Sequence, residues 1–297
     1  MIMKKQCLNN INTIKEFIRV KIIPVNVCII CMLCFLFPSV NTYANNKTEY
    51  YVIDTITSSI DHNLMCTYND SGFLEKMSGK TVYGASDWIY LYEYDNNHNI
   101  NHYKCYDVEN NKKREDLNFL YDTNDRIVSV NGVKYEILIG EYFDVDLNFK
   151  YKQGEIIVYN KSEDYSDLPY ESKIKIQYGK GREILKEVAT GYFDREADNE
   201  FDENGYLIGF NAGLMSERDK TEWTIDSVGN VVAAKSTFRN IEDNGYMPAI
   251  YSEIKYKKIM VDASDIEKLD QQKKEILATI AGNSIPGTGI YSNCVYY

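Results

Sequence analysis

One seven-residue pattern recurs along this chain and constrains its fold more strongly than any other feature. An aromatic or aliphatic residue is followed by Asp or Asn, two variable residues, Gly or a substitute, one variable residue and an aliphatic residue, most clearly at 201–207. An Asp or Asn side chain accepts backbone N–H groups two residues further on, and Gly supplies positive φ, so the pattern predicts the turn of a β-hairpin. The copies begin at Tyr68, Tyr94, Tyr121, Tyr151, Tyr178, Phe201 and Ile225, and those at Tyr151 and Tyr178 are degenerate, without Asp or Asn at the second position.

The segments before these turns alternate in polarity with a period of two. One such segment places Leu147, Phe149 and Tyr151 on one face and Asp146, Asn148 and Lys150 on the other. This alternation is typical of antiparallel strands with one buried and one solvated face. The predicted fold class is therefore mainly β: a meander of antiparallel β-hairpin repeats that forms a curved sheet over residues 45–260, with one C-terminal α-helix in residues 261–297.

The apolar face of such a sheet requires a cover, because a lone sheet cannot bury it. Either the sheet curls on itself, or another segment packs into its concave side. The one strong helical pattern, residues 265–280 with Ser264 as the predicted N-cap, is a candidate for the second role. Its apolar residues follow one stripe and are Ile266, Leu269, Ile276, Leu277 and Ile280.

Residues 1–44 have the charged, apolar and small-residue order of a secretory signal peptide. Basic residues precede an apolar run from Val25 to Val40, and Thr42 and Ala44 fit the two positions that a signal peptidase recognises. The run contains a proline and is short for a membrane span of roughly 20 residues, so cleavage is favoured over an uncleaved anchor. We therefore expect a secreted or cell-surface protein with no membrane span after cleavage.

The repeated unit resembles the YD repeat of bacterial RHS-type and wall-associated proteins, over roughly residues 64–235. The resemblance implies a hairpin-repeat architecture and export, and it implies no particular activity. The basic residue that usually follows the Gly is present only as Arg126 and, displaced, as Arg182. The repeats are too few for the large closed shell that RHS proteins build around a toxin.

The composition restricts the expected partners. Residues 1–44 hold five basic side chains and one acidic, so residues 45–297 carry 28 basic against 43 acidic residues and a net charge of −15. Nucleic acid is not expected as a partner, because phosphate binding requires clustered cations. The 26 Tyr suit strands and also offer stacking faces for sugars. A binding platform is one interpretation, and core-edge residues are the plainer one, for Tyr90, Tyr92, Tyr106, Tyr159 and Tyr170.

Two sets of residues have the chemistry of metal ligands. A calcium site is one interpretation, and a solvated strand face the plainer one, for the alternating acids Asp194, Glu196, Asp198, Glu200 and Asp202. His98, His102 and Cys105 include zinc-ligand types, but their positions in the repeat favour turn and surface roles. No other cofactor is expected. The cysteines beyond residue 44 allow at most one disulfide, and the sequence does not choose among pairings of Cys66, Cys105 and Cys294.

The sequence contains no paired nucleophile and base in a sensible context, and its three His leave little scope for acid–base chemistry. The first hypothesis is therefore an exported non-enzymatic β-repeat protein that binds a surface polysaccharide or a protein partner. The alternatives are a secreted hydrolase that uses carboxylates on the sheet face, and an accessory component of a contact-dependent toxin system. Two carboxylates about 5–10 Å apart in a tyrosine-lined groove would favour the hydrolase.

Overall fold

The computed structural model describes residues 47–60, 63–80, 87–136, 140–152, 155–160, 170–178, 184–190, 195–212, 219–237 and 247–280. The predicted signal peptide lies outside the described residues, as do Asp194 and Cys294.

The described residues form sixteen β-strands and two helical segments. The strands in the first half are β1 (Lys47–Ser58), β2 (Asn63–Tyr68), β3 (Leu74–Lys80), β4 (Asp87–Tyr94), β5 (Ile100–Asp107), β6 (Lys112–Tyr121), β7 (Ile127–Glu136) and β8 (Glu141–Lys152). Those in the second half are β9 (Glu155–Asn160), β10 (Tyr170–Tyr178), β11 (Ile184–Thr190), β12 (Arg195–Phe201), β13 (Leu207–Ala212), β14 (Asp219–Ile225), β15 (Val231–Thr237) and β16 (Ile250–Asp262). They are followed by the 3-10 turn η2 (Ala263–Asp265) and the helix α3 (Ile266–Ala278).

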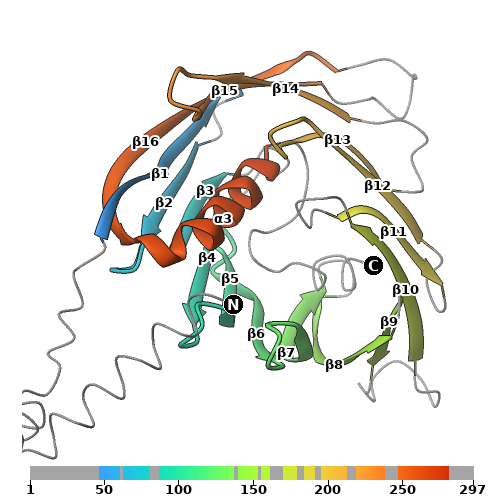
Figure 1. The fold of residues 1–297 in the computed structure, drawn as a ribbon. Helices are drawn as coiled ribbons and strands as arrows, with labels where there is room; N and C mark the ends of the chain where they lie inside the picture. The colour runs from blue at the N-terminus through green and yellow to red at the C-terminus, as the bar shows by residue number, and fades with distance from the viewer. Residues whose placement is uncertain are drawn as a thin grey trace, which may run out of the picture. The chain divides into compact units, whose positions relative to one another are not determined.

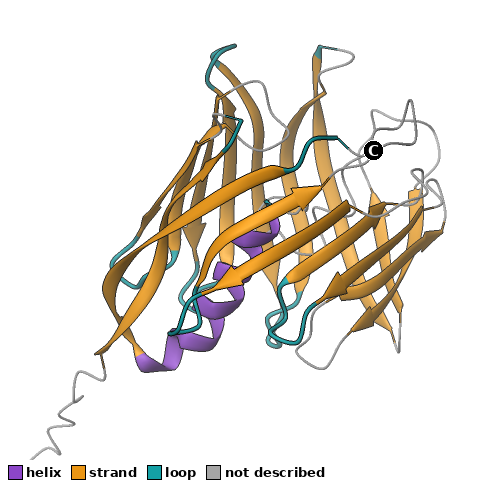
Figure 2. Cartoon of the chain, turned by 90° about the horizontal axis from the view of Figure 1, so that it is seen from above, coloured by secondary structure: helices purple, strands orange, loops and turns teal. Residues whose placement is uncertain are grey.

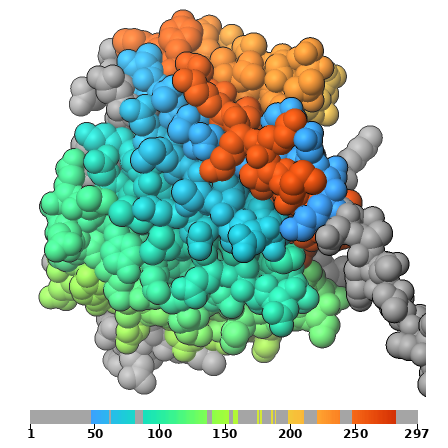
Figure 3. Space-filling view, turned by 90° about the vertical axis from the view of Figure 1, so that its left-hand side faces the viewer, coloured from blue at the N-terminus to red at the C-terminus, as the bar shows by residue number. Residues whose placement is uncertain are grey.

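Each strand pairs antiparallel with its neighbours in sequence, and the last strand returns to the first. β1 and β16 pair from Lys47↔Asp262 to Ser58↔Ser252, so the sheet closes into a barrel (Figure 1). Figure 3 shows the closure from outside, where the blue N-terminal strands border the orange C-terminal strand. Closure pairs the sheet edges that would otherwise offer unpaired backbone groups. The predicted fold class, an antiparallel hairpin meander with one C-terminal helix, is confirmed.

Every copy of the seven-residue pattern begins at or next to the end of an even-numbered strand. In most copies the first residue pairs with the final aliphatic residue of the same copy across a β-bulge, as Tyr94 does with Ile100 and Tyr121 with Ile127. The bulge adds one residue to the strand that follows the turn, and it increases the local twist of the sheet. The copies therefore form a series of equivalent bulged hairpins along one end of the barrel.

In the five copies with Asp or Asn at the second position of the pattern, that side chain holds the turn. Asp202 Oδ1 accepts the backbone N–H groups of Asn204 and Tyr206 at 2.9 and 2.8 Å. The N–H of Gly205 bonds to the carbonyl oxygen of Asp202 at 3.0 Å, and Gly205 adopts a φ of +76°. The same hydrogen bonds recur in the turns that begin at Asn69, Asp95, Asp122 and Asp226. The predicted role of the turn Asp is therefore the observed one.

Four of the tyrosines that lead a copy, together with Trp223 and Tyr256, have a second function, which joins one repeat to the repeat before it. Each side-chain O–H or N–H donates to the backbone carbonyl of the aliphatic residue that closes the preceding unit, or of the corresponding residue on β1. The donor and acceptor residues are Tyr68 and Ile53, Tyr94 and Leu74, Tyr121 and Ile100, Tyr151 and Ile127, Trp223 and Leu207, and Tyr256 and Val231, at 2.7 to 2.9 Å. We call this series the tyrosine ladder. It explains why the pattern favours Tyr over Phe at this position.

The core lies inside the barrel, on the face that the alternation predicts. The buried inward residues include Tyr90, Tyr92, Leu117, Phe119, Leu147 and Phe149. Ile225 is an exception, since it is 38% exposed although it leads a copy, and Trp223 two residues earlier replaces it in the tyrosine ladder.

The helix α3 lies inside the ring of strands, so the structure combines both of the covers expected for the apolar face (Figure 2). Ile276, Leu277 and Ile280 are buried in the same cluster as the inward residues of the sheet. The start of the helix differs from the prediction: Ser264 lies within η2, whose N-cap is Asp262 with its Oδ1 accepting the backbone N–H of Ser264, and the N-cap of α3 is Asp265, which makes no side-chain cap hydrogen bond. None of the described helices is long and apolar enough to cross a membrane.

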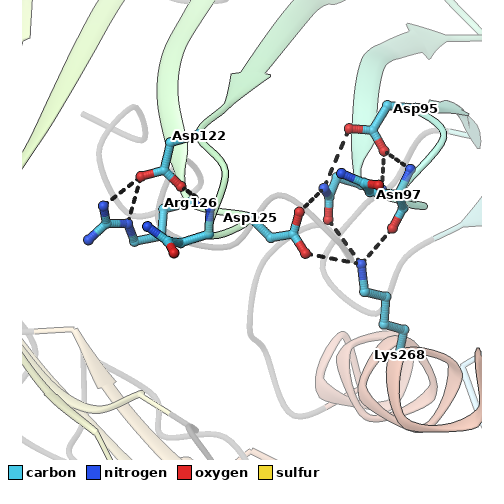
Figure 4. A network of polar contacts seen from close by, with 8 residues as sticks. Asp95, Asn97, Asp122, Asp125, Arg126 and Lys268 are labelled. Atoms are coloured by element: carbon cyan, nitrogen blue, oxygen red, sulfur yellow. Dashed lines mark hydrogen bonds and ion pairs between the residues drawn. The ribbon is translucent and has the colours of Figure 1, made fainter.

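Polar contacts attach α3 to the repeat turns (Figure 4). Lys268 Nζ donates to the carbonyl oxygen of Asn97 at 2.5 Å and lies 3.5 Å from Asp125 Oδ2. Asn99 Nδ2 donates to Asp125 Oδ1 at 2.8 Å, which connects the same two turns directly. Lys268 therefore bridges two neighbouring repeats.

A second contact is buried. Gln272, 9% exposed, accepts the backbone N–H of Leu74 with its Oε1 and donates from Nε2 to the hydroxyl oxygen of Tyr94, both at 2.9 Å. The helix is thus aligned with the tyrosine ladder as well as with the apolar core.

Candidate functional site

The tyrosines of the predicted binding platform lie on two different faces of the sheet. Tyr90 and Tyr92 are inside the barrel, 7% and 3% exposed, with ring centroids 6.5 and 5.5 Å from that of Tyr103. Tyr106 and Tyr159 lie on strand positions of the opposite parity, paired with Ile89 and Asn148. These four rings therefore do not form a single platform, the side chain of Tyr170 lies outside the described residues, and a binding role for Tyr106 or Tyr159 stays a prediction.

The alternating acids of β12 are also divided. Asp198 lies 3.8 Å from Lys186 Nζ, Glu200 is exposed, and Asp202 leaves the strand to hold the turn. Glu196 pairs with Val188 in the sheet. Within the described part of the chain, no three His, Cys, Asp or Glu side chains are grouped so that they could hold a metal ion. A calcium site that includes Asp194 stays a prediction.

The residues of the other metal-ligand set point to separate places. His98 stacks on Phe73 with ring centroids 4.5 Å apart, in the turn region near α3. His102 Nε2 lies 2.7 Å from Asp116 Oδ1, whereas Cys105 is buried in the core. Cys66 and Cys105 are free thiols, and burial raises the pKa of Cys66 to about 12 and also raises the pKa of Cys105. Both cysteines are therefore core residues.

A different group of charged and aromatic side chains lies at the barrel end opposite the repeat turns, where β4 begins and β5 ends. We call it the Arg114 cluster. It consists of Trp88, Asp107, Lys112, Arg114, Glu115, Lys134 and Tyr135. It combines buried charge with aromatic faces, which is the composition of many ligand sites.

Arg114 is placed by a β-bulge. Cys105 pairs with Glu115 and Tyr106 pairs with Lys113, so Arg114 has no opposite residue on β5. Its Nη2 donates to Asp107 Oδ2 at 2.5 Å, and its guanidinium carbon lies 4.8 Å from the ring centroid of Tyr135. Its Nε and Nη1 are buried and have no hydrogen-bond partner among the described residues. The Arg114 side chain is 11% exposed.

The cluster contains two buried carboxylates, and their pKa values are shifted in opposite directions. Burial by itself would raise the pKa of Asp107, but hydrogen bonds from Arg114 and Asn110 outweigh that effect and hold the pKa below its usual value. Burial raises the pKa of Glu115, against the opposing effects of Lys134 at 4.0 Å and of the Tyr103 hydroxyl. Asp107 therefore stays ionised as the fixed partner of Arg114, while Glu115 holds its proton more readily than an exposed Glu.

The sequence pattern does not reveal this cluster. Arg114 belongs to no repeat copy, and only the bulge and the pairing of four strands bring Trp88 and Tyr135 to it. One signal was available: residues 112–114 are the only three consecutive basic residues in a chain with a net charge of −11.

The fold defines a class of protein: a closed antiparallel barrel of repeated hairpins with an internal helix. No protein-family model matches the chain. A comparison with curated proteins likewise finds no match.

Among solved structures, the chain is similar to a porin-like protein from Bacteroides uniformis, with 13% identity and a TM-score of 0.41 over 69% of this chain and 98% of that chain. It is also similar to the Photorhabdus luminescens Tc holotoxin pore, with 10% identity and a TM-score of 0.28 over 65% of this chain. A further similar structure is TcdB2-TccC3, with 8% identity and a TM-score of 0.30 over 73% of this chain. The matches cover only 13% and 15% of those two toxin chains. At these identities and TM-scores, the similarity does not extend to function.

Proposed function

We propose that this chain is an exported, non-enzymatic hairpin-repeat protein of the YD type that binds a surface polysaccharide at the Arg114 cluster. Export rests on the signal-peptide pattern of residues 1–44, and the YD assignment rests on the repeated turn. The observation that carries the binding proposal is Arg114, whose Nε and Nη1 lack protein partners beside two aromatic rings.

The repeat itself leaves little chemistry available for a ligand. The turn Asp side chains accept two backbone N–H groups each, and the ladder hydroxyls donate to backbone carbonyls. These groups hold the barrel together. A ligand must therefore be recognised by side chains outside the repeat pattern, and the Arg114 cluster is such a set.

The unpaired donors of Arg114 carry an energetic cost in the unbound protein. A buried polar group without a partner costs about 1–3 kcal/mol, and more when it is charged. A polysaccharide supplies hydroxyl and ring oxygens to Nε and Nη1, and its C–H faces stack on rings such as Trp88 and Tyr135. Both donors are covered by protein atoms, so the proposal includes a side-chain shift at the cluster when the ligand binds.

A glycan-array screen of the purified protein, with the variant Arg114→Gln, tests this function. The matched control is Arg126→Gln, because Arg126 is also stacked on a tyrosine but has its Nε and Nη2 bonded to Asp122. We expect glycan binding that Arg114→Gln weakens and Arg126→Gln retains, with both variants folded by circular dichroism. Failure of the protein to bind any glycan would overturn the proposal, and full binding by Arg114→Gln would remove the cluster from it.

A further inference from the structure

We infer that the polysaccharide is acidic, and that its anionic groups are bound by Arg114 and Lys112. This inference rests on the proposed function and adds the chemical class of the ligand.

The charges of the cluster do not balance. Lys134 faces Glu115, and Lys113 next to the cluster donates to Asp116 at 2.7 Å. Among the described residues, Asp107 is the one carboxylate paired with Arg114, and its oxygens also accept from the backbone and side-chain amides of Asn110.

Lys112 Nζ lies 3.5 Å from the ring centroid of Tyr135, and among the described residues it has no ion pair. One ammonium and two N–H donors of a guanidinium therefore have no carboxylate partner in the described part of the chain.

The surrounding protein makes this excess positive charge unusual. The chain has a net charge of −11, and its only run of three basic residues is 112–114. An acidic surface repels a polyanion in general, so binding is restricted to a place where cations are concentrated. The same difference in charge directs the ligand, because an acidic polymer is attracted to this end of the barrel and repelled by the acidic repeat turns.

The available donors also favour charged oxygens over neutral ones. Hydrogen bonds from a guanidinium to a carboxylate or phosphate oxygen are roughly twice as strong as those between neutral groups. Asp107 holds one nitrogen of the planar guanidinium beside the Tyr135 ring, so the side-chain shift that uncovers Nε and Nη1 starts from an anchored group. A neutral glycan would use the same donors less well.

The test compares three polymers of similar length on the purified protein: neutral dextran, the carboxylate polymer polygalacturonate, and a phosphate-bearing poly(glycerol phosphate). We expect at least one of the acidic polymers to bind about tenfold more tightly than dextran at low salt, since one charge-assisted hydrogen bond is worth roughly that factor. The preference should fall in high salt. Polygalacturonate and poly(glycerol phosphate) distinguish a carboxylate source from a phosphate source.

Variants distinguish the acidic-ligand inference from the proposed polysaccharide-binding function. Arg114→Gln and Lys112→Gln should each reduce the preference for the acidic polymer, whereas Arg126→Gln should leave it intact. If dextran binds as tightly as the acidic polymers and Arg114→Gln weakens all of them, the polysaccharide function stands and the acidic ligand is refuted. If acidic polymers bind Arg114→Gln and Lys112→Gln undiminished, the anionic site lies elsewhere and the inference is refuted. If no polymer binds, both proposals fail.

Discussion

The tyrosine ladder yields the sharpest prediction, because one atom can be removed at a time. Tyr121→Phe deletes the hydroxyl that donates to the carbonyl oxygen of Ile100 at 2.9 Å and keeps the ring in the core. Burial raises the pKa of Tyr121, so the hydroxyl remains protonated and available as a donor over the whole range in which the protein would be studied. The variant therefore isolates a single hydrogen bond between two repeats.

The expected loss follows from the position of that bond. A typical internal hydrogen bond contributes about 1 kcal/mol net, and leaving the partly buried carbonyl without this donor places the cost toward about 1–2 kcal/mol. For a unit of this size, each 1 kcal/mol lowers Tm by about 2–4 °C. Urea denaturation followed by Trp fluorescence should show a lower midpoint with an unchanged m value, because the surface exposed on unfolding stays the same.

The matched control is Tyr251→Phe. Tyr251 is 57% exposed, and its hydroxyl has no hydrogen bond among the described residues, so this change should be neutral within about 0.5 kcal/mol. Equal stability of Tyr121→Phe and the wild-type protein would refute the ladder as a stabilising connection. An equal loss in Tyr251→Phe would show that the hydroxyl acts through solvation or the unfolded state instead.

Three further predictions concern the helix, a buried acid and the thiols. Gln272→Leu should lower the free energy of unfolding in urea by about 1–3 kcal/mol, because the N–H of Leu74 loses its buried acceptor. Lys268→Met should lower it by less than about 1 kcal/mol, because the contacts of Lys268 are exposed. The reverse order of the two losses would contradict the assigned contacts. The pKa of Glu115 in the folded protein is raised above its ordinary 4.5, so Glu115 favours folding below that pH and this contribution is lost as the pH rises through the folded pKa. Glu115→Gln should therefore flatten this part of the stability–pH curve, and an unchanged curve would contradict the raised pKa. With a pKa of about 12, Cys66 should resist Ellman's reagent at pH 8 until the protein is unfolded, and rapid modification of native protein would show that it is not buried.

Much of the fold is readable from the sequence because the repeated unit is local. Asp202 and Gly205 are three residues apart, and the hydrogen bonds that make the turn stay within 202–206. Strand alternation is equally local, since it depends only on which residues share a face. These two signals are sufficient for the hairpins, the buried face and the polar face.

The helix shows how far such local signals extend. Its apolar stripe correctly identifies Leu269, Ile276 and Leu277 as buried residues. The stripe does not reveal Gln272, which lies between them on the same face and is buried because its amide meets Leu74 and Tyr94. A polar residue on an apolar stripe is the signal that was available for this contact.

The candidate site was less accessible to sequence reasoning. Tyrosines at strand positions suggested a binding platform, but two of the four are buried because they face the barrel interior. Arg114 gains its partners from three other strands, and its unpaired donors depend on a bulge that no sequence pattern marks. Functional groups that converge through strand pairing cannot be found from their spacing along the chain.

The sequence alone determined the unit that is repeated: a turn capped by Asp or Asn, a residue at positive φ, and strands that alternate in polarity. Only the tertiary structure decided that β1 and β16 pair to close the sheet, that α3 lies inside it, and that Tyr94, Tyr121 and Tyr151 bond to the preceding repeat. The physical reason is the range of the interactions. A turn is stabilised within five residues, whereas closure and the ladder depend on the cumulative twist and stagger of all the strands between their partners.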